Sequence, residues 1–168
     1  MDNGDINQQF LKAYEKLADG IFRYCYLRIS DREKARDIMQ ETFIKTWKYL
    51  AEGHAINNLK AFLYRTASNL IIDEYRKNKT VSLDLMREKD GFDPVGDNAG
   101  DIIDLAEAQN AIRLINKLEP GYREIIIMRY INDLSVKDIA QILGESENNV
   151  SVKIHRGLEK LKSLMNGE

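Results

Sequence analysis

The sequence is poor in the residues that build disulfides or metal sites, with one cysteine and two histidines in 168 residues. Cys25 cannot form an internal disulfide, and its place among helically spaced apolar residues favours a buried packing role. His54 and His155 are far apart and have no cysteine partners, which argues against a structural zinc site. We therefore expect no metal and no other cofactor.

Long apolar runs are also missing, since no run approaches the roughly 20 residues that a transmembrane helix needs. Residues 1–9 are polar and acidic, without the basic start and apolar core of a secretory signal. The sequence thus predicts a cytoplasmic protein without membrane insertion. It also contains no nucleophile–base set, phosphate-binding glycine loop or metal spacing, so we do not expect an enzyme.

The formal net charge of −2 does not indicate nucleic-acid binding, but the charge is unevenly distributed. Residues 1–80 contain 14 basic and 11 acidic side chains, residues 81–104 contain 2 and 7, and residues 105–168 contain 9 of each. The acidic middle segment therefore masks a mildly basic first part. Because affinity for DNA rises with the number of phosphates neutralised, so weak a positive charge requires a larger partner.

Helical spacing dominates most of the chain. Apolar residues at intervals of three and four predict helices over about 6–17, after Gly20, over about 32–50 and over about 59–77. Ser30 or Asp31 can cap the helix that begins at Arg32. No segment alternates with period two, so we expect an all-α fold.

This pattern stops at residues 79–104, where three glycines and a proline stand among seven acidic residues. Such a composition predicts an acidic, flexible linker. Helical spacing returns from Leu105 to Leu118, is interrupted at Pro120 and resumes over 122–131. The sequence thus predicts two small helical domains, residues 1–78 and 105–168. They should tumble semi-independently unless a partner or direct packing holds them together.

The clearest local signal lies in residues 134–158. Ser135 is a good N-cap, and Asp138 three residues later nearly completes a capping box. Gly144 supplies the positive φ that ends this helix, and Ser146 caps the next one. Two short helices joined by a glycine turn predict a helix-turn-helix whose second helix enters the major groove. A plain helical hairpin with a solvated face is the alternative.

Two other predicted helices have, opposite their buried apolar residues, polar faces that could bind a partner. The helix over 59–77 has an aromatic and basic face that consists of Lys60, Tyr64, Asn69, Tyr75, Arg76 and Lys77. Bases stack on rings and cations follow the backbone of single-stranded DNA, although ordinary packing is the commoner explanation of such residues. The preceding helix exposes Arg36, Asp37, Gln40, Glu41, Lys45 and Lys48, which fits either a docking surface or any solvated helix.

Three segments in order resemble the sigma factors of bacterial RNA polymerase. Residues 37–43 with Trp47 resemble their core-polymerase-binding helix, and residues 62–69 with Asp73 and Arg76 resemble their promoter-melting helix. Residues 118–124 and the helix-turn-helix resemble their last domain. The order and spacing are those of the extracytoplasmic-function (ECF) group, which keeps two domains joined by a linker.

The resemblance implies a transcription initiation factor that brings core RNA polymerase to promoter DNA, both double-stranded and melted. Polymerase binding would involve Asp37, Gln40, Glu41, Phe43 and Trp47. The minus-ten element would meet Gly53, His54, Asn57, Asn58, Lys60, Tyr64, Asn69 and Arg76, with the loop 53–58 capturing a flipped base. The minus-thirty-five element would meet Asn148, Asn149, Ser151, Val152, Lys153 and Arg156. An anti-sigma factor is a candidate further partner, because many relatives have one.

The sequence departs from the family at three of these places. The family often has tryptophan where Phe62 stands, arginine or lysine where Ser151 stands, and serine where Val152 stands. The last two changes remove hydrogen-bond donors, so the family's commonest minus-thirty-five sequence cannot be assumed. The main rival interpretation is a stand-alone helix-turn-helix regulator, which leaves the segment from Asp37 to Trp47 without a role.

Overall fold

The computed structural model describes residues 2–78 and 102–167, and every regular element in these ranges is helical. In chain order the elements are α1 (Asn3–Ile29), α2 (Arg32–Ala51), α3 (Leu59–Asn78), α4 (Ile102–Asn116), α5 (Pro120–Ile126), the π-helical turn η2 (Ile127–Ile131), α6 (Val136–Leu143) and α7 (Glu147–Met165). None of these helices is long and apolar enough to cross a membrane.

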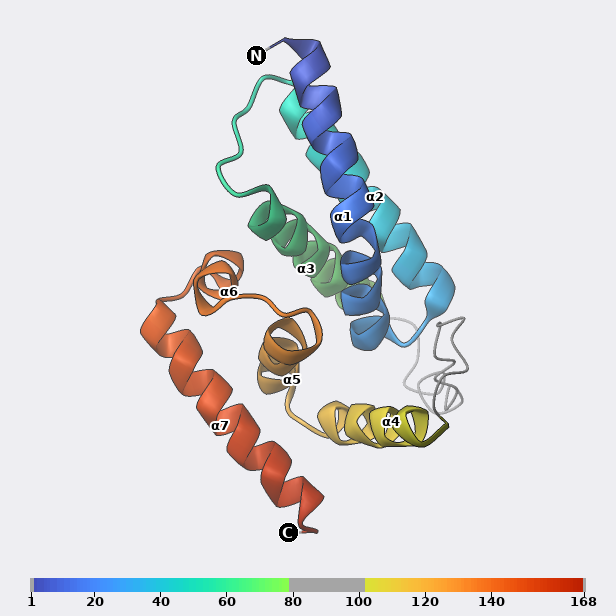
Figure 1. Cartoon of the computed structure of the whole chain (residues 1–168), viewed down its shortest axis with the longest axis vertical. Helices are drawn as coiled ribbons and strands as arrows, with labels where there is room; N and C mark the ends of the chain where they lie inside the picture. The colour runs from blue at the N-terminus through green and yellow to red at the C-terminus, as the bar shows by residue number, and fades with distance from the viewer. Residues whose placement is uncertain (1, 79–101, 168) are drawn as a thin grey trace.

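The helices form two groups, α1–α3 and α4–α7 (Figure 1). This confirms the predicted all-α fold with two helical parts, the second of which contains the helix-turn-helix. The predicted acidic linker lies outside the described residues, except that α4 already begins at Ile102 within the segment assigned to it.

The first helix, α1, runs through Gly20 without a break, so the predicted pair of helices on either side of this glycine is wrong. The glycine serves close packing instead, because a Cβ atom at residue 20 would lie 2.8 Å from the Tyr64 hydroxyl oxygen. Its carbonyl oxygen also accepts a 2.8 Å hydrogen bond from Asn132 Nδ2. A residue without a side chain is therefore required where α1, α3 and the segment after η2 meet.

The next two helices begin at side-chain caps. The Asp31 carboxylate accepts hydrogen bonds from the backbone amides of Glu33 and Lys34 at 3.1 and 3.2 Å, which starts α2. Ser30, the alternative cap in the sequence, instead ends α1 in the left-handed conformation. Asn58 Oδ1 accepts a 3.1 Å hydrogen bond from the backbone amide of Ala61 and so caps α3. These caps satisfy amides that a helix start leaves without partners.

The predicted caps of the helix-turn-helix are confirmed. Ser135 Oγ accepts a 3.0 Å hydrogen bond from the backbone amide of Asp138, and Ser146 Oγ accepts one of 3.1 Å from that of Asn149. Gly144 ends α6 with a φ of 66°. The predicted helix over 122–131 is divided, because α5 ends at Ile126 and the chain continues as η2.

The two helical groups pack directly against each other, with α3 beside α6 (Figure 1). The turn η2 also contacts α1. The buried apolar side chains of both groups belong to one continuous core. The sequence predicted semi-independent tumbling unless direct packing or a partner held the domains together. The structure shows such direct packing.

We predict that Gly20→Ala lowers the free energy of unfolding by about 1–3 kcal/mol, since the added methyl group displaces the Tyr64 hydroxyl from a tightly packed site. Gly4→Ala is the matched control, because it lies in the same helix and nothing lies within 4 Å of a Cβ there. Helix propensity alone predicts unchanged or slightly raised stability for that control. Chemical denaturation of the two variants checks this, and equal stabilities would contradict it.

Candidate nucleic-acid interface

The outward face of α7 carries most of the side chains predicted to read duplex DNA. Val150, Ile154 and Gly157 are buried and fix which side of α7 faces the core. A Cβ at Gly157 would lie 3.2 Å from the Ile126 side chain, so this glycine lets α7 approach α5 closely. Of the residues predicted to meet the minus-thirty-five element, those exposed on α7 are Asn148, Asn149, Ser151, Val152 and Arg156.

Lys153, the remaining member of the minus-thirty-five set, is half-buried and already paired. Its Nζ lies 2.5 Å from Oε1 of Glu145, in the turn between α6 and α7. To bind a phosphate or a guanine, Lys153 must first break its ion pair with Glu145. Glu145 was not among the residues predicted from the sequence. The turn at Gly144 brings Glu145 back toward α7, and helical spacing does not reveal a contact of this kind.

The loop between α2 and α3 is bordered by three rings. His54 stacks on Tyr49, with ring centroids 4.4 Å apart. The Phe62 ring also contacts Tyr49, at a centroid distance of 5.0 Å. Gly53 takes a φ of 89°, which L-residues with a side chain rarely adopt, and this turns the loop after α2. Tyr49 was not among the predicted site residues, although its position just before the loop and its partial exposure mark it as part of this surface.

The predicted minus-ten residues fall into three groups by exposure. Gly53, His54, Asn57, Asn69 and Arg76 are exposed. Asn58 and Lys60 are half-buried, and the side-chain amide of Asn58 donates to Asp138 Oδ1 at 3.0 Å and to Gln141 Oε1 at 2.8 Å. The loop before α3 is thus bound to α6 of the helix-turn-helix.

Tyr64 forms the third group and is 2% exposed. Its ring packs edge-on against Tyr24, with centroids 5.5 Å apart, and its hydroxyl oxygen accepts a 3.0 Å hydrogen bond from Asn132 Nδ2. Burial raises the pKa of the Tyr64 hydroxyl above its usual value, and the hydrogen bond from Asn132 opposes that rise. In this arrangement Tyr64 is enclosed, with Tyr24 of α1 against its ring and Asn132 of the second helical group at its hydroxyl, so no base can stack on it.

The residues of α2 predicted to bind polymerase lie on two different faces. Asp37 and Gln40 are exposed and Glu41 is half-buried on the outer side. Phe43, 3% exposed, and the half-buried Trp47 instead pack edge-on against Phe10 of α1, at centroid distances of 6.0 and 5.2 Å. Phe43 and Trp47 are therefore placed to support α2 from within.

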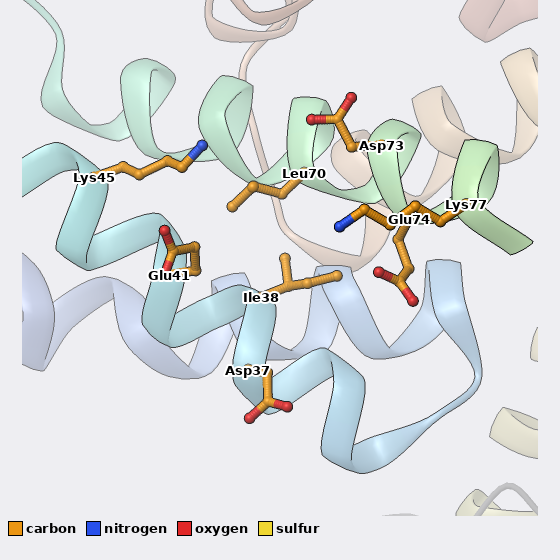
Figure 2. A pocket seen from close by; sticks show the side chains of 8 residues that line it. All are labelled: Asp37, Ile38, Glu41, Lys45, Leu70, Asp73, Glu74 and Lys77. Carbon is orange, nitrogen blue, oxygen red and sulfur yellow. The ribbon is translucent and has the colours of Figure 1, made fainter.

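A shallow groove runs between α2 and α3 beside this outer face (Figure 2). Ile38 and Leu70 point toward each other across it, and its charged margin consists of Asp37, Glu41, Lys45, Asp73, Glu74 and Lys77. The margin is net acidic, with four carboxylates and two ammonium groups. Sequence reasoning missed Ile44, which is 47% exposed on the same face of α2 and outside the buried stripe.

Each of the two helical groups matches a known protein family. Residues 13–81 match the model described as Sigma-70 region 2, and residues 108–161 match Sigma-70, region 4. Two such regions in this order define a sigma-70-type transcription initiation factor. A stand-alone helix-turn-helix regulator would leave the first match unexplained.

Individual relatives show which group of sigma factors the chain belongs to. The chain is 32% identical over 161 residues to the ECF RNA polymerase sigma factor SigW of Bacillus subtilis (strain 168), covering 88% of this chain and 83% of SigW. It is 26% identical to SigM of the same organism, covering 92% of this chain and 94% of SigM. The chain belongs to the ECF RNA polymerase sigma factors.

Solved structures share the fold. CnrH, solved in complex with the cytosolic domain of CnrY, is 20% identical and covers 96% of this chain and 90% of its own, with a TM-score of 0.71. The sigma factor RpoE of Bartonella quintana, solved with the anti-sigma factor NepR, is 22% identical and covers 95% and 98%, with a TM-score of 0.73.

The placement of α7 predicts different consequences for two of its exposed residues. Asn149 lies in the first turn, where its amide can pair with an adenine edge, so Asn149→Ala should cost about 1–3 kcal/mol at one base position. Arg156 lies further along, where the helix leaves the groove, so Arg156→Ala should weaken binding to all sequences and reduce the salt slope by about one. Binding isotherms on matched and scrambled minus-thirty-five duplexes at several salt concentrations test this. Sequence-independent loss for Asn149→Ala would show that the helix is placed wrongly.

Proposed function

We propose that this chain acts in the cytoplasm as a sigma factor without catalytic activity of its own, and that its two helical groups divide the work. Residues 1–78 bind core RNA polymerase and read and open the minus-ten element. Residues 105–168 read the minus-thirty-five element, and residues 79–104 connect the two. The observation that carries this proposal is the presence of regions 2 and 4, in order, in one chain whose second part is a helix-turn-helix.

The polymerase-binding surface that we propose is the outer face of α2 with the adjoining groove. Asp37, Gln40 and Glu41 lie there, and the exposed Ile44 adds an apolar contact. Docking surfaces commonly combine such an apolar anchor with a charged margin. The net acidic margin suits a basic surface on the partner, which would increase the rate of encounter. Phe43 and Trp47 contribute by holding α2 against α1.

The minus-ten surface that we propose comprises the loop after α2 and the exposed face of α3. The His54 ring stacks on Tyr49 and the Phe62 ring lies tilted against Tyr49, so this cluster offers aromatic faces beside the loop. Stacking of bases on such rings is tolerant of base identity. Asn57 and Asn69 are exposed and supply amides for base edges, while Arg76 is available for phosphate. Tyr64 joins this surface only when the second helical group moves away.

Promoter geometry requires such a movement. The two promoter elements lie about 25 base pairs apart, or about 85 Å of duplex at about 3.4 Å per base pair. In the structure, Asn58 beside the loop is 2.8 Å from Gln141 of α6. The 8-residue α6 and the 19-residue α7 span about 12 and 28 Å at about 1.5 Å per residue. The two surfaces are therefore too close together to reach both elements at once.

An anti-sigma factor is a further partner that we propose. The similar CnrH and RpoE chains were both solved with other proteins, in the case of RpoE with the anti-sigma factor NepR. The fold that this chain shares with CnrH and RpoE supports the proposal.

The direct test of the function is run-off transcription with purified chain and core polymerase on genomic fragments, followed by mapping of start sites. We expect discrete transcripts that core polymerase alone does not make. A chain that binds DNA in a sequence-specific manner but neither binds core polymerase nor directs initiation would favour the stand-alone regulator.

Charge reversal on the outer face of α2 should weaken core binding. The double change Asp37→Lys and Glu41→Lys places like charges against a basic partner surface, and we expect at least about a tenfold loss of affinity. Glu107→Lys on the exposed side of α4 is the control for a change of charge elsewhere. Pull-down and fluorescence titration with core polymerase measure the loss. If both proteins bind core equally well, the polymerase-binding surface lies elsewhere.

Removal of the Asn69 amide should impair promoter opening. A lost hydrogen bond to an unpaired base corresponds to about 1 kcal/mol, or about a fivefold loss of open complex. Asn78→Ala, the same change at the exposed end of α3, is the matched control. Permanganate reactivity of unpaired thymines in the minus-ten region reports opening in holoenzyme. Equal reactivity in the two variants would remove Asn69 from the minus-ten surface.

A further inference from the structure

The ion pair between Glu145 and Lys153 places an ammonium group at the end of α7 that is predicted to enter the major groove. Glu145 directly precedes Ser146, the N-cap of α7, and lies eight residues before Lys153. The Lys153 side chain therefore runs back toward the helix start, the direction in which long side chains point in helices. Its Nζ lies 2.5 Å from Oε1 of Glu145. The pair thus joins the turn of the helix-turn-helix to the second turn of its recognition helix.

The start of α7 has few positive charges with which to bind DNA. Lys153 is the only basic residue in the first two turns, where Glu147 is acidic. A positive charge near a helix N-terminus is disfavoured by the helix dipole, whereas a carboxylate is favoured there. The carboxylate of Glu145 offsets this effect and holds the Lys153 ammonium group at the helix start.

Separation of this pair is costly for Glu145. The side chains of Glu145 and Lys153 are 27% and 44% exposed. Oε2 of Glu145 is buried, and among the described residues it has no hydrogen-bond partner. If Lys153 leaves for a DNA phosphate, Oε1 loses its partner as well, and the negative charge of the phosphates repels the carboxylate. A phosphate therefore compensates Lys153 but not Glu145.

A G·C base pair can compensate both charges at once. In the major groove guanine presents two adjacent acceptors, O6 and N7, and cytosine presents its N4 amino group as a donor. The Lys153 ammonium group can donate to the two guanine acceptors, while Oε1 of Glu145 accepts from cytosine N4. An A·T pair has its donor between two acceptors and a methyl group at the end, so its pattern does not match this order.

We propose that Glu145 is a specificity-determining residue, and that Glu145 and Lys153 exchange their ion pair for contacts with one G·C base pair of the minus-thirty-five element. The proposal rests on the function proposed above for residues 105–168. On other base pairs the ion pair stays closed, and α7 binds through its neutral residues and Arg156. Glu145 thus restricts to one base pair a lysine that would otherwise bind any phosphate.

Binding of holoenzyme to a set of promoters tests the proposal. The set carries each of the four base pairs in turn at every position of the mapped minus-thirty-five element, and competition titrations measure the relative affinities. For the wild type we expect a preference for G·C in one orientation at one position, which Glu145→Gln and Lys153→Gln each reduce by at least about fivefold. The double change should reduce it no further than either single change, because both residues act on one contact.

The salt dependence gives a second measurement. In Glu145→Gln, Lys153 is free to bind a phosphate on promoters that lack the G·C pair, so the salt slope on these promoters should increase by about one. Glu147→Gln is the matched control, because it removes the same charge from an exposed position in the first turn of α7. We expect this control to change the affinity for all promoters by the same factor. Because each result is a ratio of affinities of one protein, a loss of folded protein does not imitate the effect.

A Glu145→Gln chain whose affinity changes by the same factor on every promoter would overturn the proposal and leave Glu145 a structural residue of the turn. A preference for any base pair other than G·C at the affected position would overturn it as well. If wild-type holoenzyme shows no preference at any position and Asn149→Ala has no position-specific effect, the minus-thirty-five surface itself is wrong. The two failures are thus distinguishable.

Discussion

The ion pair between Arg28 and Glu124 is the constraint on which the arrangement of the two halves depends. Two charges removed from water must lie together and must use their remaining hydrogen-bonding capacity, or the structure is strongly destabilised. Tyr24 and Ser68 complete that requirement, and they place α5 against α1 and α3 in one orientation. Because α5 continues into η2 and then α6, the same orientation puts Asn132 over Tyr64 and α6 against the loop before α3.

Local structure followed from the sequence because its causes are local. Ser135, Gly144 and Ser146 act within a few residues of their own positions, and each begins or ends a helix as predicted. Asp31, one of the two caps that the sequence offered for α2, begins that helix. The outward face of α7 was likewise predictable, since the buried Val150 and Ile154 fix which residues must point away. Family resemblance then supplied the order of the two regions, which the matches to regions 2 and 4 confirm.

The features that the sequence did not predict arise from contacts between distant segments. Gly20 looks like a helix end until Tyr64 and Asn132 are seen beside it. Tyr64 looks like an exposed aromatic residue on a basic face, yet it is buried, with Tyr24 of α1 against its ring and Asn132 at its hydroxyl. Glu124 appears in the sequence only as part of a family motif, and nothing in its spacing reveals that its partners lie in α1 and α3. The side-chain roles predicted for the DNA surfaces remain predictions.

The central claim is that the free chain is closed and that it opens on the polymerase. Spin labels on cysteines placed at the exposed positions Glu52 and Glu147 would report the distance between the loop after α2 and the start of α7. The account predicts a single short, narrow distance distribution in the free protein and a much longer distance when core RNA polymerase is added. A broad distribution of long distances in the free protein, unchanged by polymerase, would contradict it.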